Sequence, residues 1–138
     1  MNHDIYICYT EQDKAIAEEI CQAMEQQEIF CWLNSRNIDF NKPFARSVIK
    51  AINDCKCVIV IMSAYANESS QVEYEIDLAY KNKKIIVPFL IENITTNPIF
   101  KYYFSTNILD NSCSNSLCNI NDLVKYVCSI TGKIYQDN

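Results

Sequence analysis

The stretch "CVIVIMSAYANESSQVEYEIDLAYKNKKIIVPFLI", residues 57–91, predicts the fold of this chain. It begins and ends with apolar runs, at 57–62 and 84–91, that show no polar alternation. Runs rich in Val and Ile are typical of parallel strands that are covered on both faces. The residues between them, 70–82, repeat apolar side chains at helical spacing. The stretch therefore indicates a strand–helix–strand unit with two parallel strands.

The same alternation extends over the rest of the chain. Further strands are predicted at residues 4–9, 29–33 and 107–110. Further helices are predicted at residues 13–27, 44–53, 98–104 and 120–131. This pattern predicts an α/β fold: a flavodoxin-like, doubly wound, five-stranded parallel sheet in the order 2-1-3-4-5. The 138 residues fit a single domain, 1–138, with its ligand crevice at the carboxyl ends of strands one and three.

The helix between the two apolar runs carries three acids at alternate positions: Glu73, Glu75 and Asp77. At roughly 100° per residue, Glu73 and Asp77 fall on the polar side of this helix, whereas Glu75 falls on the side that packs inward. Burial of an unpaired charge is costly. Glu75 must therefore be paired, neutralised or used in chemistry. Ser69 or Ser70 is the expected N-cap of the helix.

Charge and hydropathy exclude some partners. The net charge is −5, with 17 acidic and 12 basic residues, and no basic block stands out as it does in nucleic-acid binders. No stretch approaches the ~20 apolar residues of a membrane span. The first ten residues, "MNHDIYICYT", lack the features of a signal peptide. We therefore expect a cytoplasmic protein that binds neither nucleic acid nor membranes.

The eight cysteines have spacings that favour reduced thiols over disulfides or a metal site. No Cys-x-x-Cys is present, the closest pair is Cys55 and Cys57, and the one histidine is His3. Cysteines within apolar segments behave as small buried hydrophobes. These are Cys8, Cys31, Cys57 and Cys128. Cys113 and Cys118 lie in a polar segment and are expected to be exposed.

Several functions of α/β proteins are excluded by missing residues. The one glycine, Gly132, leaves neither a Walker phosphate loop nor a GxGxxG turn. The segment after the first strand, "YTEQDK", is unlike a flavin phosphate loop, and the third strand ends without the aspartate of a phosphoacceptor receiver. A Ser-His-Asp or Cys-His arrangement lacks a usable histidine. General acid–base chemistry must therefore come from carboxylates, and Glu75 is the candidate.

Four motifs, in this order, resemble those of the bacterial TIR (Toll/interleukin-1 receptor-like) domain family. "ICYTEQD" (7–13) is similar to the family's strand end and polar Ser-x-x-Asp loop. "NSRNI" (34–38) is similar to its Arg-Asp-Ile loop, and "VIVIMS" (58–63) to its third strand, which ends in serine. The helix with Glu75 precedes "IVPF" (86–89), which resembles the family's fourth strand.

The resemblance covers residues 4–91 and implies an activity. Many members of the family cleave NAD⁺ at the nicotinamide–ribose bond, and some cyclise the product. Their catalytic glutamate lies on the third helix, at the position of Glu75. Enzymatic members often carry an aromatic residue where this chain has Gln71. The loop at 39–43 lacks the family's glycine, and Asn37 stands where an aspartate is common.

The resemblance also implies a set of substrate-binding residues: Tyr9, Thr10, Arg36, Ser63 and Gln71. Several of the site residues also fit a structural role, and Arg36 fits a solvated loop arginine. Glu75 equally fits a structural acid paired with Arg36 or Arg46, Tyr9 fits core packing, and Ser63 fits a turn cap.

Two function classes therefore stand side by side. The first is an enzyme, a glycohydrolase or cyclase, for which NAD⁺ is the substrate and no cofactor or metal is needed. For a bacterial protein the resemblance implies a role in anti-phage defence, with the product acting on a separate effector. The second class is a non-catalytic interaction module that acts through TIR–TIR assembly. Self-association is expected in both classes.

Overall fold

The computed structural model describes residues 3–37, 44–105 and 119–136. Within these residues, a parallel sheet of four strands has the order β2-β1-β3-β4. The strands are β1 (Ile5–Cys8), β2 (Cys31–Trp32), β3 (Cys57–Met62) and β4 (Ile85–Leu90). The predicted α/β fold and the order of the first four strands are confirmed. The predicted fifth strand, 107–110, lies outside the described residues.

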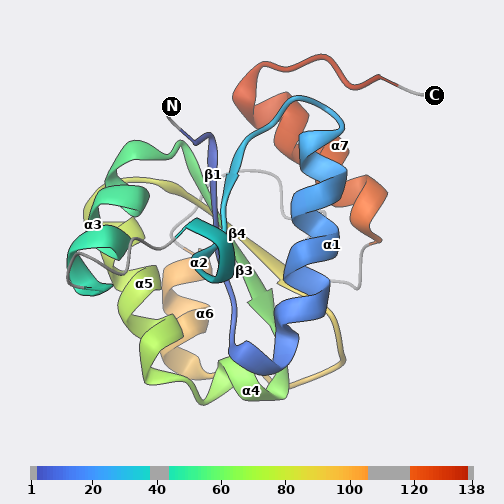
Figure 1. The fold of residues 1–138 in the computed structure, drawn as a ribbon. Helices are drawn as coiled ribbons and strands as arrows, with labels where there is room; N and C mark the ends of the chain where they lie inside the picture. Colours follow the sequence, from blue (N-terminus) through green and yellow to red (C-terminus); the bar gives the residue numbers. More distant parts are fainter. Residues whose placement is uncertain (1–2, 38–43, 106–118, 137–138) are drawn as a thin grey trace.

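Helices cover both faces of the sheet (Figure 1). They are α1 (Lys14–Glu25), α2 (Asn34–Asn37), α3 (Phe44–Asp54), α4 (Ala64–Asn67), α5 (Ser70–Lys81), α6 (Pro98–Ser105) and α7 (Ile120–Thr131), with a 3-10 turn η1 (Glu11–Asp13) before α1. Helices α1 and α7 lie together on one side, and α3, α5 and α6 lie on the other. The arrangement has three layers, as a doubly wound sheet requires.

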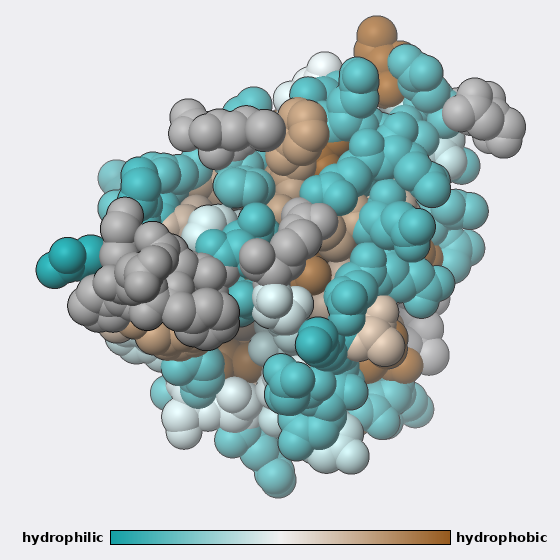
Figure 2. Space-filling model, in the orientation of Figure 1, coloured by the Kyte–Doolittle hydropathy of each residue, from teal (hydrophilic) through white to brown (hydrophobic). Residues whose placement is uncertain are grey.

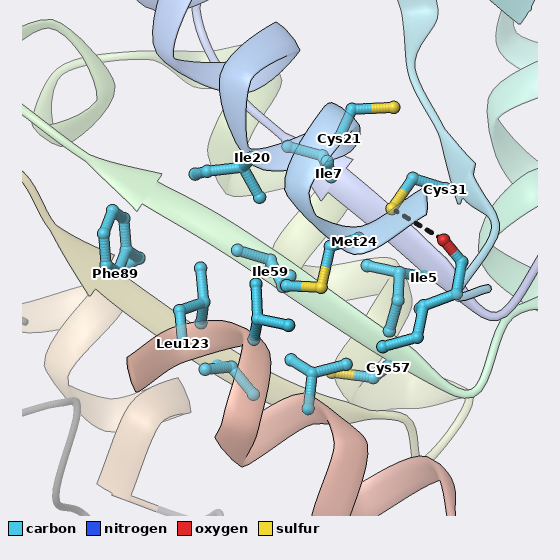
Figure 3. Packing of buried hydrophobic residues seen from close by; sticks show 14 of the residues in the cluster. Ile5, Ile7, Ile20, Cys21, Met24, Cys31, Cys57, Ile59, Phe89 and Leu123 are labelled. Atoms are coloured by element: carbon cyan, nitrogen blue, oxygen red, sulfur yellow. Dashed lines mark hydrogen bonds between the residues drawn. The ribbon is translucent and has the colours of Figure 1, made fainter. Parts of the chain in front are cut away.

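Alternate residues of each strand face opposite layers. Ile5 and Ile7 of β1 pack in the cluster formed with α1 and α7, whereas Tyr6 and Cys8 pack in the cluster formed with α3, α5 and α6. Figure 3 shows the first cluster, in which α1 and α7 side chains meet the isoleucines of β1 and β3. Both faces of β1 and β3 are buried, which explains why their sequences show no polar alternation.

The described cysteines occupy positions in the protein interior, among apolar residues. The six within the described residues are buried thiols and form no disulfide: Cys8, Cys21, Cys31, Cys55, Cys57 and Cys128. Burial raises the pKa of Cys55 to about 11. The burial predicted for four of them is confirmed, and Cys113 and Cys118 lie outside the described residues.

Polar side chains cap the N-termini of α5 and α7, and a glycine ends α7. Ser69, one of the two predicted caps of α5, accepts a hydrogen bond from the backbone N–H of Val72 at 3.1 Å. Asn119 accepts one from the N–H of Asp122 at 2.8 Å at the start of α7. Gly132 ends α7 with a φ of 78°, a left-handed conformation that glycine adopts without strain. The cap of α5 fixes where this helix begins, and its buried side, with Val72, Ile76 and Ala79, faces the sheet.

The surface is largely polar. The face seen in Figure 2 is covered mainly by hydrophilic side chains, with smaller hydrophobic areas between them. Among the helices that the structure describes, none combines the length and the hydropathy needed to cross a membrane.

Candidate active site

Glu75 lies on the inner face of α5 and is 2% exposed. It shares this face with buried apolar residues one turn away on either side, Val72 and Ala79. The inward position predicted from the helical periodicity is confirmed. Asp77, by contrast, turns outward and forms an ion pair with Lys81 at 2.9 Å.

Two side chains hold the carboxyl group of Glu75. The hydroxyl of Tyr6, from β1, donates a hydrogen bond to Oε1 at 2.9 Å. The amide Nε2 of Gln71, one turn earlier on α5, donates to Oε2 at 2.6 Å. Tyr6 is completely buried, whereas Gln71 is exposed. One oxygen is therefore bound to the protein interior and the other to a side chain at the surface.

Burial is the strongest influence on the charge of this group. It raises the pKa of Glu75, and hydrogen bonds from Gln71 and Tyr6 partly oppose that rise because they favour the carboxylate. Burial also raises the pKa of Tyr6 and of Cys8, and the adjacent charge of Glu75 raises both further. The phenol and the thiol therefore keep their protons at neutral pH. The phenol donates to Glu75, whereas the thiol of Cys8 donates to the backbone carbonyl of Val72 at 3.9 Å.

A second row of residues orients Tyr6. The amide Nδ2 of Asn34, at the start of α2, donates to the Tyr6 hydroxyl oxygen at 3.2 Å. The indole N–H of Trp32, at the end of β2, donates to Oδ1 of Asn34 at 2.8 Å. A chain of hydrogen bonds thus runs from β2 through β1 to Glu75. The one signal in the sequence that could have found it is the tyrosine within an apolar strand, since a buried tyrosine hydroxyl usually has a hydrogen-bond partner.

The other predicted site residues form separate groups. Thr10 and Ser63 both donate to Oδ2 of the buried Asp13, Thr10 at 2.9 Å. Ser63 also accepts from the N–H of Ala66 and caps α4, so its predicted structural role is present as well. The hydroxyl of Tyr9 accepts a hydrogen bond from a backbone N–H in α2.

Of the predicted substrate-binding residues, Gln71 is therefore the one that the structure joins directly to Glu75. Arg36 lies in α2, but its side chain is outside the described part of the structure. Arg46 is exposed on α3, and no ion pair among the described side chains joins it to Glu75. The structural reading in which Arg46 neutralises the glutamate is not supported.

A hollow of about 490 Å³ lies elsewhere, beside α1. Its lining includes Lys14 and Glu18 of α1 together with Leu33 and Ser35, which follow β2. Glu75 is not part of this lining. The hollow is therefore a different feature from the buried carboxyl site.

Comparison with known proteins places the chain in a family. A family model described as "TIR domain" matches residues 5–114, which include Glu75 and its partners. The chain belongs to the TIR domain family. The match extends beyond the last motif found in the sequence. It confirms the predicted resemblance to TIR domains, and the bacterial branch of the family stays a prediction. No curated protein matches the chain.

Solved structures show the same fold at low identity. The TIR domain of the Toll-related receptor TRR-2 from Hydra magnipapillata is 18% identical, with a TM-score of 0.69 over 91% of each chain. A metazoan TIR-STING receptor from C. gigas is 19% identical, with a TM-score of 0.68 over 89% of this chain and 39% of the receptor. The CMP N-glycosidase BcmB from Clostridium botulinum is 15% identical, with a TM-score of 0.59 over 90% and 98%.

Proposed function

We propose that this TIR domain cleaves NAD⁺ at the nicotinamide–ribose bond and that Glu75 is its catalytic carboxylate. The observation that carries the proposal is the position of Glu75. Its carboxyl group is 2% exposed, is bound by two hydrogen-bond donors and comes from the helix that carries the glutamate of enzymatic relatives. A structural acid at this place would be replaceable by an apolar residue, whereas a reaction through a cation needs the charge.

The chemistry needs few groups. The C–N bond to nicotinamide breaks, its electron pair leaves with the nicotinamide, and the cationic pyridinium becomes neutral. No general acid is required. The ribosyl centre becomes an oxocarbenium ion, and the Glu75 carboxylate stabilises its positive charge. Attack by water, with loss of a proton, gives ADP-ribose. Attack by a nucleophile of the same molecule gives a cyclic product.

Access to the carboxyl passes Gln71. This side chain is exposed and its amide lies on Oε2 at 2.6 Å. Exposed side chains change rotamer within nanoseconds, and giving up one hydrogen bond to a charged group costs about 1.5–3 kcal/mol. A ribose hydroxyl can repay that cost by donating to the same oxygen. In this proposal Gln71 contacts the substrate, and Tyr9, Thr10, Arg36 and Ser63 are further substrate contacts.

The type of bond agrees with one of the structural neighbours. BcmB is named as a CMP N-glycosidase, and the nicotinamide–ribose bond is also an N-glycosidic bond. At 15% identity this neighbour supports the fold and not the substrate. Its name shows that a protein with a similar fold cleaves an N-glycosidic bond, and this is all that it adds to the proposal.

The biological setting is part of the same proposal. We infer a cytoplasmic enzyme of anti-phage defence that consumes NAD⁺ without cofactor or metal. Its copies associate through TIR–TIR contacts, and its product acts on a separate effector. The product is either ADP-ribose or a cyclic form of it.

A non-catalytic interaction module is the second candidate, and exposed aromatic residues favour it. Tyr74 and Tyr80 on α5 are 44% and 38% exposed, and Tyr102 on α6 is 58% exposed. Tyr80 and Tyr102 lie close together, with ring centroids 6.2 Å apart. Tyrosines are enriched in protein–protein interfaces, so this surface suits assembly with or without catalysis.

Incubation of the protein with NAD⁺ separates the two functions. We expect release of nicotinamide, and the mass of the second product distinguishes ADP-ribose from a cyclic form, which is lighter by one water. Light scattering on the same sample gives the state of assembly. Assembled protein that releases no nicotinamide would support the interaction module instead.

A further inference from the structure

The two oxygens of the Glu75 carboxyl group have different surroundings. Oε1 accepts from the hydroxyl of Tyr6, a residue of the central strand β1 with 0% exposure. Oε2 accepts from the amide of Gln71, whose side chain is exposed. The first contact cannot be exchanged for a substrate without opening the core. The second can be exchanged by one side-chain rotation.

The direction of the hydrogen bonds around Tyr6 can be deduced from its neighbours. An indole N–H is a donor only, so the Asn34 atom that lies 2.8 Å from Trp32 must be the oxygen, Oδ1. The Asn34 amide nitrogen then faces Tyr6 at 3.2 Å and donates to the phenol oxygen. With its oxygen accepting from Asn34, Tyr6 directs its own proton to Glu75. The chain therefore delivers a donor to Oε1.

We propose that Tyr6 is a positioning residue for Glu75, with Asn34 and Trp32 fixing the direction of its hydrogen bond. In this assignment Oε1 stays anchored to Tyr6 throughout the reaction, and Oε2 is the oxygen that a substrate ribose contacts after Gln71 moves away. The assignment rests on the proposed function for its substrate. Its structural part, a carboxylate held by Tyr6, does not depend on that function.

Removal of the Tyr6 hydroxyl tests this part. A hydrogen bond donated to a carboxylate favours the charged form, so its loss raises the pKa of the acid. Two titratable groups from β1 face Glu75, Tyr6 and Cys8, while the contact from α5 is the uncharged Gln71. In Tyr6→Phe the ring still fills its buried place and the amide donor of Gln71 remains. We expect the titration midpoint of Glu75 to rise by about one pH unit.

The matched control is Tyr103→Phe. Tyr103 also donates its hydroxyl to an acid of α5, to Oδ1 of Asp77 at 2.7 Å, on the outer side of the helix. This variant removes a hydrogen bond of the same chemistry from the same helix without touching Glu75. We expect it to leave the midpoint of Glu75 unchanged.

The experiment follows the Glu75 carboxyl carbon by ¹³C NMR across a pH series, with Glu75→Gln used to assign the signal. Nicotinamide release from NAD⁺ is measured over the same series. In Tyr6→Phe we expect a higher titration midpoint, an acid limb of the rate profile shifted by the same amount, and kcat about tenfold lower with KM little changed. Asn34→Ala should shift the midpoint in the same direction and keeps the test available if Tyr6→Phe does not fold.

The outcomes separate the two proposals. Equal midpoints in the wild type, Tyr6→Phe and Asn34→Ala would overturn the role of Tyr6, whatever the activity. A raised midpoint in a protein that releases no nicotinamide would support the anchoring of Oε1 and contradict the proposed function. A fall in kcat without a change in midpoint would also contradict the role proposed for Tyr6.

Discussion

At the scale of single residues, Glu75 is an acid whose buried position disfavours the ionised form. Burial raises its pKa from the ordinary value of 4.5, so the folded protein holds this proton more tightly than the unfolded chain. The stability that Glu75 contributes, relative to an uncharged side chain, is therefore fully present below its ordinary pKa. This contribution is lost as the pH rises through the pKa that Glu75 has in the folded protein. An acid kept under these conditions suits a function that needs its negative charge.

Because burial raises the pKa of Glu75, we predict that Glu75→Gln stabilises the protein at neutral pH. Glutamine keeps the shape, its oxygen can accept from Tyr6, and the exposed Gln71 can turn to accept from the new amide. We expect a gain of about 1 kcal/mol, or roughly 3–6 °C in Tm, at neutral pH. The gain should disappear below about pH 4. Thermal unfolding of both proteins across pH measures it, and a lower Tm for the variant at neutral pH would contradict the argument.

Residues of the site were predictable to different degrees. The helical period shows that Glu75 turns inward while Asp77 turns outward, because a helix has one buried side. The period says nothing about what the carboxyl meets there. Tyr6 belongs to a strand buried on both faces, and such a strand carries no polar alternation to show which residues face α5. Its contact with Glu75 joins positions 69 residues apart and depends on which face of β1 meets α5 as well as on the sheet order.

At the scale of elements, a single side chain caps the N-terminus of α5, the helix that carries Glu75. Ser69 caps the helix by accepting from the N–H of Val72 at 3.1 Å, and Ser70 is its first residue. We predict that Ser69→Ala lowers the free energy of unfolding by about 1 kcal/mol. Ser70→Ala is the matched control and should change it by less than about 0.5 kcal/mol. Urea denaturation measures both, and equal effects would show that Ser69 is not the cap.

Long elements were predicted better than short ones. The predicted helix 70–82 and strand 57–62 agree with α5 (Ser70–Lys81) and β3 (Cys57–Met62) to within a residue, because each has a sustained pattern. The predicted strand 29–33 is reduced to Cys31–Trp32 in β2. Helix α2 (Asn34–Asn37) has four residues, too few for a hydrophobic period. Yet α2 supplies Asn34, so the part of the site that orients Tyr6 could not be predicted.

At the scale of the whole molecule, the parallel sheet brings together residues from β1, β2 and α5. The order β2-β1-β3-β4 places Tyr6 between the strand that carries Trp32 and the strand that precedes α5. This order was predictable from the alternation of strands and helices and from the resemblance. On the side of Gln71 the carboxyl group of Glu75 is covered by an exposed amide. A second copy of the chain is the proposed source of the missing substrate contacts.

We therefore predict that specific activity rises with protein concentration. In a dilute monomer, NAD⁺ is held by one chain, whereas assembly adds contacts that orient it, and orientation can contribute several kcal/mol to the reaction barrier. Nicotinamide release per protomer is measured across a roughly hundredfold dilution series, with light scattering at each concentration. A constant rate per protomer at a strictly monomeric mass would show that one chain carries a complete site.

The central claim is that Glu75, and not another acid of α5, performs the chemistry. The most direct measurement compares nicotinamide release from NAD⁺ by Glu75→Gln and Glu73→Gln. Both variants remove one negative charge from the same helix, but the Glu75 carboxyl is buried and Glu73 is partly exposed. We predict a loss of about a thousandfold or more for Glu75→Gln, in a protein at least as stable as the wild type, and less than about a twofold change for Glu73→Gln. Comparable activity in the two variants would contradict the account.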